Sequence, residues 1–301
     1  MEVKIVSKIL VSGLINIETT LNIGKFPYDY TPVRYEFDKV GSSVSGVGYN
    51  VAKALKTLSD DVLFNSIIGK DQLSEMVIDV LKNEGIKTEN ILKLLKETPQ
   101  SVILYDNKGK RSINVDLKNI QETEYPEEIF VNSIKKSDMV VLCNINFSRK
   151  YLKLAKDLGK IIASDVHAIS YLEDEYNKDF MKYPDILFMS DENIKNPENF
   201  IKETYNKFKN KIIVIGLGKK GALIHDADKN EIKHFKAVDV RPIVNTIGAG
   251  DSLFSSFLHF YAKGKDSYEA LKKAIVFAGY KIGEKSASKG FLTENELEKY
   301  I

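Results

Sequence analysis

Several residue types are scarce in this sequence, and each scarcity excludes a kind of protein. The 301 residues include no tryptophan, one cysteine and four histidines. Because Cys143 is alone, the chain can form neither an internal disulfide nor a thiolate metal cluster, and a lone thiol fits a reducing compartment. We therefore expect a cytoplasmic protein. No metal-ligand spacing occurs among the histidines, which are His167, His225, His234 and His259.

Charge of one sign and long apolar runs are also missing. Lysine and arginine total 44 against 42 aspartate and glutamate residues, so the formal net charge is only +2. Nucleic-acid surfaces need clustered basic residues, yet arginine occurs only at Arg34, Arg111, Arg149 and Arg241. No apolar run approaches the roughly twenty residues of a membrane span. The N-terminal MEVKIVSKILVSGLINIE becomes charged too early for a signal peptide. We expect a soluble protein without a nucleic-acid or membrane partner.

What the sequence does contain is an alternation of short β-rich apolar runs with longer amphipathic stretches. Runs such as DVLFNSII, DMVVLC and PDILFM alternate with stretches such as VGYNVAKALKTL and PENFIKETYNKFK. Strands separated by helices predict βαβ units and a mostly parallel sheet that is covered on both faces. No repeat or low-complexity linker interrupts the pattern, so the sequence predicts a single α/β domain over residues 1–301.

Two segments, 31–43 and 100–117, break this alternation because no helix accompanies them. The second is predicted to be a hairpin around the turn sequence DNKGK. We expect the two segments to form a small separate sheet that serves as a lid over a cleft or as a homodimer surface. An ordinary extension of the main sheet's edge is the alternative. The apolar side of the small sheet would consist of Val33, Tyr35, Phe37, Ile103 and Tyr105.

Three glycine clusters need an explanation. Gly216, Gly218 and Gly221 match G-x-G-x-x-G, but the dinucleotide fingerprint must open a helix, whereas ALIHDADKNEIKHF follows here and predicts a hairpin. This cluster is therefore either a plain turn or a turn whose backbone contacts a nucleotide. In the second cluster, Gly46 and Gly48 precede a predicted helix that carries Asn50. These two glycines either serve packing alone or allow a ligand to approach the backbone closely.

The third cluster, NTIGAGDSLFSSFLHF, combines a helix start with a carboxylate. Gly248, Ala249 and Gly250 present N–H groups where the helix dipole favours an anion. Asp251 would compete with that anion unless it has another task, and proton abstraction during phosphoryl transfer is such a task. A simple first-turn capping charge is the alternative. The sequence contains no Walker-type loop, no H-R-D or D-F-G kinase motif and no G-x-S-x-G elbow.

With these motifs in this chain order, the sequence resembles the ribokinase family, also called PfkB-type carbohydrate kinases, over essentially its whole length. The family's N-terminal G-x-x-N-x-D pattern is present as Gly13, Asn16 and Glu18. Its G-x-G-x-N-x-A loop is present as Gly46, Gly48, Asn50 and Ala52, and its D-T-x-G-A-G-D signature as Asn245, Thr246, Gly248, Ala249, Gly250 and Asp251.

The resemblance implies a ribokinase-like three-layer α/β/α fold with a β-sheet lid, and an enzyme that transfers the γ-phosphoryl group of ATP to a sugar hydroxyl. It implies that Asp251 is the catalytic base, that the Gly248–Gly250 amides form an anion hole, and that Asn16, Glu18, Gly46, Gly48 and Asn50 contact the substrate. The nucleotide contacts that it implies are Ser190, Asn193, Gly218, Gly221, Thr246, Gly248, Gly250 and Ala278.

Departures from the family pattern bear on cofactors. ATP and Mg²⁺ are the implied pair, with Glu192 near the metal through water. Asn245 replaces an aspartate at a loop where relatives bind a monovalent cation, so cation dependence stays open. Glu18 is one methylene longer than the usual aspartate.

The substrate also stays open. The Asn-Thr start of the signature and Asp116 at the end of the lid hairpin resemble the pseudouridine kinase branch, and Tyr35, Phe37 and Tyr105 could stack on a base. We favour a furanose-type carbohydrate as the acceptor. A pseudouridine or other ribonucleoside kinase is one alternative, and a catalytically weak sugar- or nucleoside-binding sensor is another.

Overall fold

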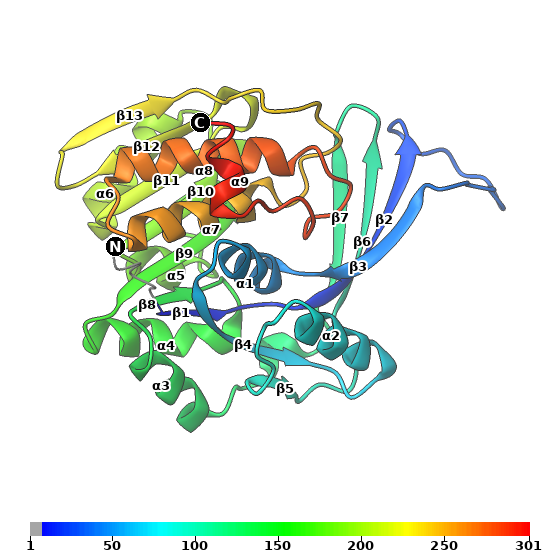
Figure 1. Cartoon of the computed structure of the whole chain (residues 1–301), viewed down its shortest axis with the longest axis horizontal. Coiled ribbons are helices and arrows are strands. Elements are labelled where there is room, and N and C mark those ends of the chain that lie inside the picture. Colours follow the sequence, from blue (N-terminus) through cyan, green and yellow to red (C-terminus); the bar gives the residue numbers. More distant parts are fainter. Residues whose placement is uncertain (1–7) are drawn as a thin grey trace.

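The computed structural model describes residues 8–301, so part of the N-terminal segment interpreted above lies outside it. A nine-stranded sheet forms the centre (Figure 1). In spatial order its strands are β13 (Glu231–Phe235), β12 (Ala222–Asp226), β11 (Ile212–Gly216), β10 (Ile186–Ser190), β9 (Ile161–Ala168), β8 (Met139–Leu142), β1 (Lys8–Ser12), β4 (Asp61–Ile68) and β5 (Ile91–Lys93). All neighbours from β11 to β5 are parallel, whereas β12 and β13 form the predicted antiparallel hairpin.

Helices cover both faces of this sheet, which confirms the predicted three-layer architecture. One face packs against α1 (Val47–Thr57), α2 (Gln72–Asn83), α7 (Ala249–Ala262), α8 (Ser267–Lys281) and α9 (Glu294–Leu297). The other packs against α3 (Glu127–Lys135), α4 (Asn146–Asp157), α5 (Lys178–Lys182) and α6 (Pro197–Phe208). Strand β1 shows why a continuous apolar run is required: Ile9 and Val11 enter the first core, Leu10 enters the second, and all three are fully buried.

A four-stranded sheet projects from one end of the large sheet (Figure 1). Its order is β3 (Val40–Ser45), β2 (Asn16–Gly24), β6 (Gln100–Asp106) and β7 (Arg111–Asp116). The hairpin predicted within 100–117 is confirmed as β6 and β7. The segment 31–43 is a strand only from Val40 onward, and β2, which pairs with both β3 and β6, was not anticipated in this sheet.

The difference at residues 31–39 has a geometric cause. The pairing of β2 with β3 begins at Leu21 and Val40, so the residues before Val40 have no neighbouring strand. Val33, Tyr35 and Phe37 are accordingly 66%, 82% and 80% exposed, whereas Ile103 and Tyr105 in β6 are buried. The five residues therefore do not share one apolar side, and the expectation that they would is wrong.

The topology places polar residues at one edge of the large sheet. After β1 the chain continues to β4 and β5 on one side and later enters β8 on the other side, so the strand order reverses beside β1. Ligands in open parallel sheets bind beyond the carboxyl ends of the strands at such a reversal.

Among the described residues, no helix has the length and hydropathy needed to cross a membrane.

Candidate active site

The end of β1 and the start of α1 are in direct backbone contact. A Cβ atom at Gly48 would lie 2.4 Å from the carbonyl carbon of Gly13, and one at Gly13 would lie 2.7 Å from the Cα of Gly48. Neither position can accept a side chain unless the helix moves. Packing alone thus explains Gly48, and the close approach carries Asn50, in the first turn of α1, to the edge of the sheet.

Asp251 is held by Asn50 rather than by the backbone of its own helix. It lies in the first turn of α7, where it is 9% exposed, and the Asn50 Nδ2 donates to Asp251 Oδ2 at 2.7 Å. Helix α7 has no side-chain cap at Gly248, and Asp251 is the acidic residue of its first turn, a position that also suits a charge that favours the helix dipole. Burial raises the pKa of Asp251, while the charge of His167 and the Asn50 amide lower it.

The turn before Asp251 requires glycine. Gly248 has a φ of 74°, and a Cβ atom there would lie 2.7 Å from the Ala287 carbonyl oxygen. The Ala249 N–H donates to the Thr246 carbonyl at 3.3 Å, so this amide is engaged within the turn. The N–H groups of Gly248, Gly250 and Asp251 have no backbone partner among residues 8–301, so they are the amides of this turn that are free to bind an anion.

Asn16 and Glu18, on β2, offer acceptor atoms that nothing in the described chain satisfies. Both are buried; the Asn16 Nδ2 donates to the Ser101 hydroxyl at 3.1 Å, and the Ser45 hydroxyl donates to Glu18 Oε2 at 3.0 Å. Asn16 Oδ1 and Glu18 Oε1 have no hydrogen-bond partner within residues 8–301. Buried acceptors are normally satisfied, so these two atoms point to a ligand that donates hydrogen bonds, as hydroxyl groups do.

A chain of polar contacts joins the two carboxylates. The single proton of the Ser45 hydroxyl can be donated to Glu18 Oε2 at 3.0 Å or to Asn50 Oδ1 at 3.4 Å, and the Asn50 amide donates to Asp251. Burial raises the pKa of Glu18, the Ser45 hydroxyl and the Ala287 backbone amide lower it, and the nearby charge of Asp251 raises it. Glu18 and Asp251 are therefore close enough to influence each other's ionisation.

Lys281 is a site residue that the sequence analysis missed. It is the last residue of α8, is fully buried, and its Nζ donates to the Ile247 carbonyl. Burial lowers its pKa to about 8, against the opposing attraction of Asp251 and Glu18. A lysine in the last helical turn is ordinarily a surface residue that favours the helix dipole, so its burial could not be predicted from its position in the sequence.

Asp165 and His167, at the end of β9, also adjoin Asp251. The His167 backbone has a φ of 56°, and its N–H donates to Asp165 Oδ1 at 2.9 Å. One side-chain atom each of Asp165, His167 and Asp251 lie within 4.8 Å of one another. Only the fold brings these residues together, which is why the spacing of the histidines gave no indication of the cluster.

Arg111 links the small sheet to the expected nucleotide side, and the sequence analysis missed this as well. Its Nη1 donates to Thr246 Oγ1 at 2.5 Å and its Nη2 to Glu192 Oε1 at 3.1 Å. Glu192 belongs to the 3₁₀ turn η2 (Asp191–Asn193), which follows Ser190 at the end of β10. The predicted residues Ser190, Glu192, Asn193 and Thr246 thus lie around one edge of the site.

The remaining predicted nucleotide residues lie in two other elements. Gly218 opens the 3₁₀ turn η3 (Gly218–Lys220) and has open space beside it. A Cβ atom at Gly221 would lie only 2.0 Å from the Phe235 carbonyl, so this glycine is required by the β12–β13 hairpin. Ala278 is half-buried on α8.

Asn245 is engaged with the backbone at both ends of its amide. Its Nδ2 donates to the Lys285 carbonyl at 2.9 Å, and its Oδ1 accepts from the Ile247 N–H at 2.9 Å. The side chain is buried and fastens the loop before α7. At the loop where the family resemblance implies a monovalent cation, the Asn245 amide is thus already hydrogen-bonded, and the Lys281 ammonium bonds the Ile247 carbonyl.

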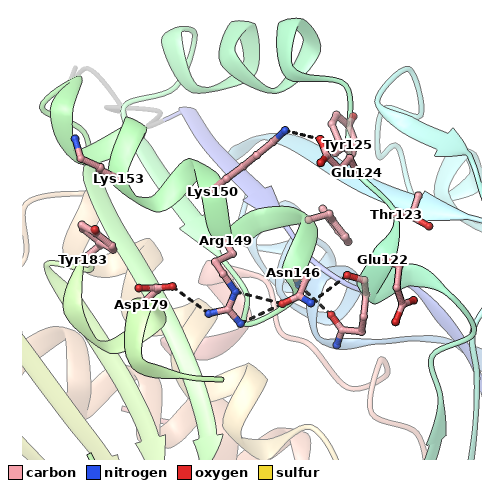
Figure 2. A pocket seen from close by; sticks show the side chains of 12 residues that line it. Glu122, Thr123, Glu124, Tyr125, Asn146, Arg149, Lys150, Lys153, Asp179 and Tyr183 are labelled. Atoms are coloured by element: carbon pink, nitrogen blue, oxygen red, sulfur yellow. Dashed lines mark hydrogen bonds and ion pairs between the residues drawn. The ribbon is translucent and has the colours of Figure 1, made fainter. Parts of the chain in front are cut away.

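A surface pocket of about 460 Å³ lies apart from these residues, between the loop around the 3₁₀ turn η1 (Ile120–Glu122) and helices α4 and α5 (Figure 2). Figure 2 shows two ion pairs among its lining residues: Arg149 with Asp179 at 3.3 Å and Lys150 with Glu124 at 2.9 Å. The third cation, Lys153, pairs with Asp157 at 2.6 Å. Because its cations already have partners, this pocket is not a candidate for the reaction site.

Comparisons with known proteins bear on the family and the fold of the chain. Residues 6–294 match the family described as pfkB family carbohydrate kinase. A 5-dehydro-2-deoxygluconokinase of Clostridium botulinum is 26% identical over 315 residues, covering 93% of this chain and 91% of the relative. A microbiome-derived acarbose kinase superposes with a TM-score of 0.87 at 21% identity, covering 98% of each chain. A nucleoside kinase of Methanocaldococcus jannaschii superposes with a TM-score of 0.78 at 19% identity, covering 98% and 97%. At these identities the two structures share the fold.

Proposed function

Because the chain belongs to the pfkB family of carbohydrate kinases, we propose that it transfers the γ-phosphoryl group of ATP to a hydroxyl of a small furanose-type sugar. Its family makes it a phosphotransferase that acts on an alcohol group. The observation that supports the proposal best is the juxtaposition of Asp251, oriented by Asn50, with the unpartnered acceptors of Glu18 and Asn16.

In the proposed mechanism Asp251 accepts the proton of the attacking hydroxyl. Its raised pKa makes it a stronger base than an exposed aspartate, and the Asn50 amide fixes the direction of the receiving oxygen. The Gly250 N–H and the positive end of α7 stabilise the negative charge that develops on the transferred group. General base catalysis of this kind contributes roughly 10²–10⁴-fold to a rate.

On the substrate side, Glu18 Oε1 and Asn16 Oδ1 would accept hydrogen bonds from hydroxyl groups of the sugar. Both residues lie on β2 of the small sheet, so a sugar bound there is covered by that sheet. We propose that the small sheet acts as the lid and excludes water, which would otherwise compete as the phosphoryl acceptor.

We propose ATP as the donor and Mg²⁺ as its metal partner. Mg²⁺ is usually held by one or two carboxylates together with phosphate oxygens, and the partly exposed Asp191 and Glu192 supply such carboxylates at the end of β10. The ion supplies charge neutralisation of the phosphates when bound. The proposed nucleotide contacts remain Ser190, Asn193, Gly218, Gly221, Thr246, Gly248, Gly250 and Ala278.

The replacement Asp251→Asn tests the proposal. We expect turnover to fall by about 10²–10⁴-fold with folding and ligand binding retained, because the amide cannot accept the proton. The exposed Asp228 provides a matched control, and Asp228→Asn should retain wild-type kinetics. An ADP-release assay over ribose, fructose, ribonucleosides and pseudouridine measures the effect and identifies the acceptor. Near-wild-type turnover in the Asp251 variant would contradict the assignment.

The same panel tests the two alternatives. Turnover only with ribonucleosides or pseudouridine would favour a nucleoside kinase. Ligand-induced thermal shifts without turnover on any acceptor would favour the sensor.

We keep dimerisation through the small sheet as a separate proposal. Val40 and Val102 remain 62% and 47% exposed on it, and apolar surface of this kind can serve an interface. Light scattering coupled to size-exclusion chromatography measures the mass: a 34.0 kDa particle would contradict a dimer.

A further inference from the structure

Lys281 is a fully buried lysine at the catalytic turn. Lysine is rarely found without solvent contact, because removing an ammonium group from water costs several kcal/mol unless other groups replace the hydration. The Lys281 Nζ donates to the Ile247 carbonyl, one residue before Gly248. A charged side chain, Lys281, thus occupies a buried position at which proteins ordinarily place an apolar side chain.

The charges around Lys281 come from three parts of the fold. Asp251 of α7 and Glu18 of β2 attract the ammonium, and Glu284, just after α8, attracts it as well. Arg241, in the loop that follows β13, repels it. The two carboxylates that the proposed mechanism uses are therefore both counter-charges of the same buried cation.

The loop between Asn245 and Gly248 is held from two sides. The Asn245 amide bonds the Lys285 carbonyl and the Ile247 N–H, and Lys281 holds the Ile247 carbonyl. Two cations contact this loop: the partly exposed Arg111 at the Thr246 hydroxyl and the fully buried Lys281 at the Ile247 carbonyl. The Asn245 side chain carries no charge, so it adds no negative charge that would need a further cation.

We propose that Lys281 is a positioning residue that serves as a fixed internal cation: it holds the turn before Asp251 in place through the Ile247 carbonyl and favours the ionised forms of Glu18 and Asp251. This inference rests on the proposed function for its kinetic consequences only. A tethered ammonium does not dissociate, so turnover should not depend on an added monovalent cation. The ammonium deprotonates near its pKa of about 8, so turnover should fall as the pH rises through that value.

The variants Lys281→Met and Lys281→Ala test the inference, with Lys272→Met, an exposed position on the same helix, as the control. We expect Lys281→Met to lower kcat at least 100-fold while its thermal unfolding stays cooperative. In Lys281→Ala, ammonium or methylammonium ions should restore kcat at least tenfold, because a small cation can occupy the space that the side chain leaves. A kcat within threefold of wild type in Lys281→Met, or a wild-type enzyme that requires potassium, would overturn the inference.

A second readout does not depend on turnover. Carbon-13 NMR of labelled aspartate measures the pKa of Asp251 in the wild type and in Lys281→Met, and we expect a rise of at least one unit in the variant. An unchanged pKa would overturn the inference even in a protein that phosphorylates no tested sugar. A raised pKa together with no turnover in the wild type would instead support the internal cation and reject the proposed kinase function.

Discussion

The hydrogen bond between Asn50 and Asp251 gives the sharpest prediction about the base. In the wild type the Asn50 amide donates to Asp251 Oδ2 at 2.7 Å and favours the ionised carboxylate. The variant Asn50→Ala removes this donor. A hydrogen bond to a charged group contributes about 1.5–3 kcal/mol, which corresponds to roughly one to two pKa units. The pKa of Asp251 is already raised by burial, so losing the amide must raise it further.

In the proposed mechanism Asp251 acts as the base only when it is ionised, so activity should fall as the pH drops through its pKa. We therefore expect the acid limb of the kcat/KM profile to move upward by about one to two pH units in Asn50→Ala. Asn50 is also a proposed substrate contact, and a change in KM alone would not be diagnostic, whereas the position of the limb reports the base. The exposed Asn199 provides the control Asn199→Ala. An acid limb that stays in place would refute the reasoning.

Two further predictions concern packing and charge. Gly48→Ala should lower the free energy of unfolding by about 3 kcal/mol, because the new Cβ atom would lie 2.4 Å from the Gly13 carbonyl carbon. Gly216→Ala is the control, since the nearest atom to its Cβ would be 3.8 Å away. Equal denaturation midpoints for the two variants would contradict the argument. His167→Asn should raise the pKa of Asp251, because the charge of His167 lowers it, and should move the acid limb of the kcat/KM profile to higher pH. His234→Asn, at an exposed position, should leave that limb unchanged. An acid limb that does not move in His167→Asn would reject the role of His167.

Features that depend on local sequence could be predicted. The alternation of apolar runs and amphipathic stretches predicted the layered fold, and the turn sequences predicted both the β6–β7 and β12–β13 hairpins. The glycines and carboxylate before α7 predicted the helix start with Asp251 in its first turn. These features follow from the periodicity and turn preferences of neighbouring residues, which the fold did not override.

Features that depend on contacts distant in sequence could not be predicted. Strand β2 joins the small sheet because β3 and β6 lie on either side of it, and nothing in NIETTLNIG specifies that pairing. Arg111 reads as one surface cation of a hairpin, yet it reaches Thr246 and Glu192. Tyr35 and Phe37 suggested an apolar face, but without a neighbouring strand they remain exposed.

The chain of polar contacts from Glu18 through Ser45 and Asn50 to Asp251 suggests how substrate binding would be coupled to the proposed chemistry. Glu18 comes from the small sheet and Asp251 from α7 against the large one, and Ser45 and Asn50 connect them. A shift of the small sheet would stretch this chain and would also separate Arg111 from Thr246. Hydroxyl groups that bind Glu18 and Asn16 would hold the small sheet in place, so a sugar that satisfied these acceptors would also keep Asp251 oriented toward the attacking hydroxyl of the sugar. A water molecule bonds too few of these groups to do the same, which favours transfer to the sugar over hydrolysis.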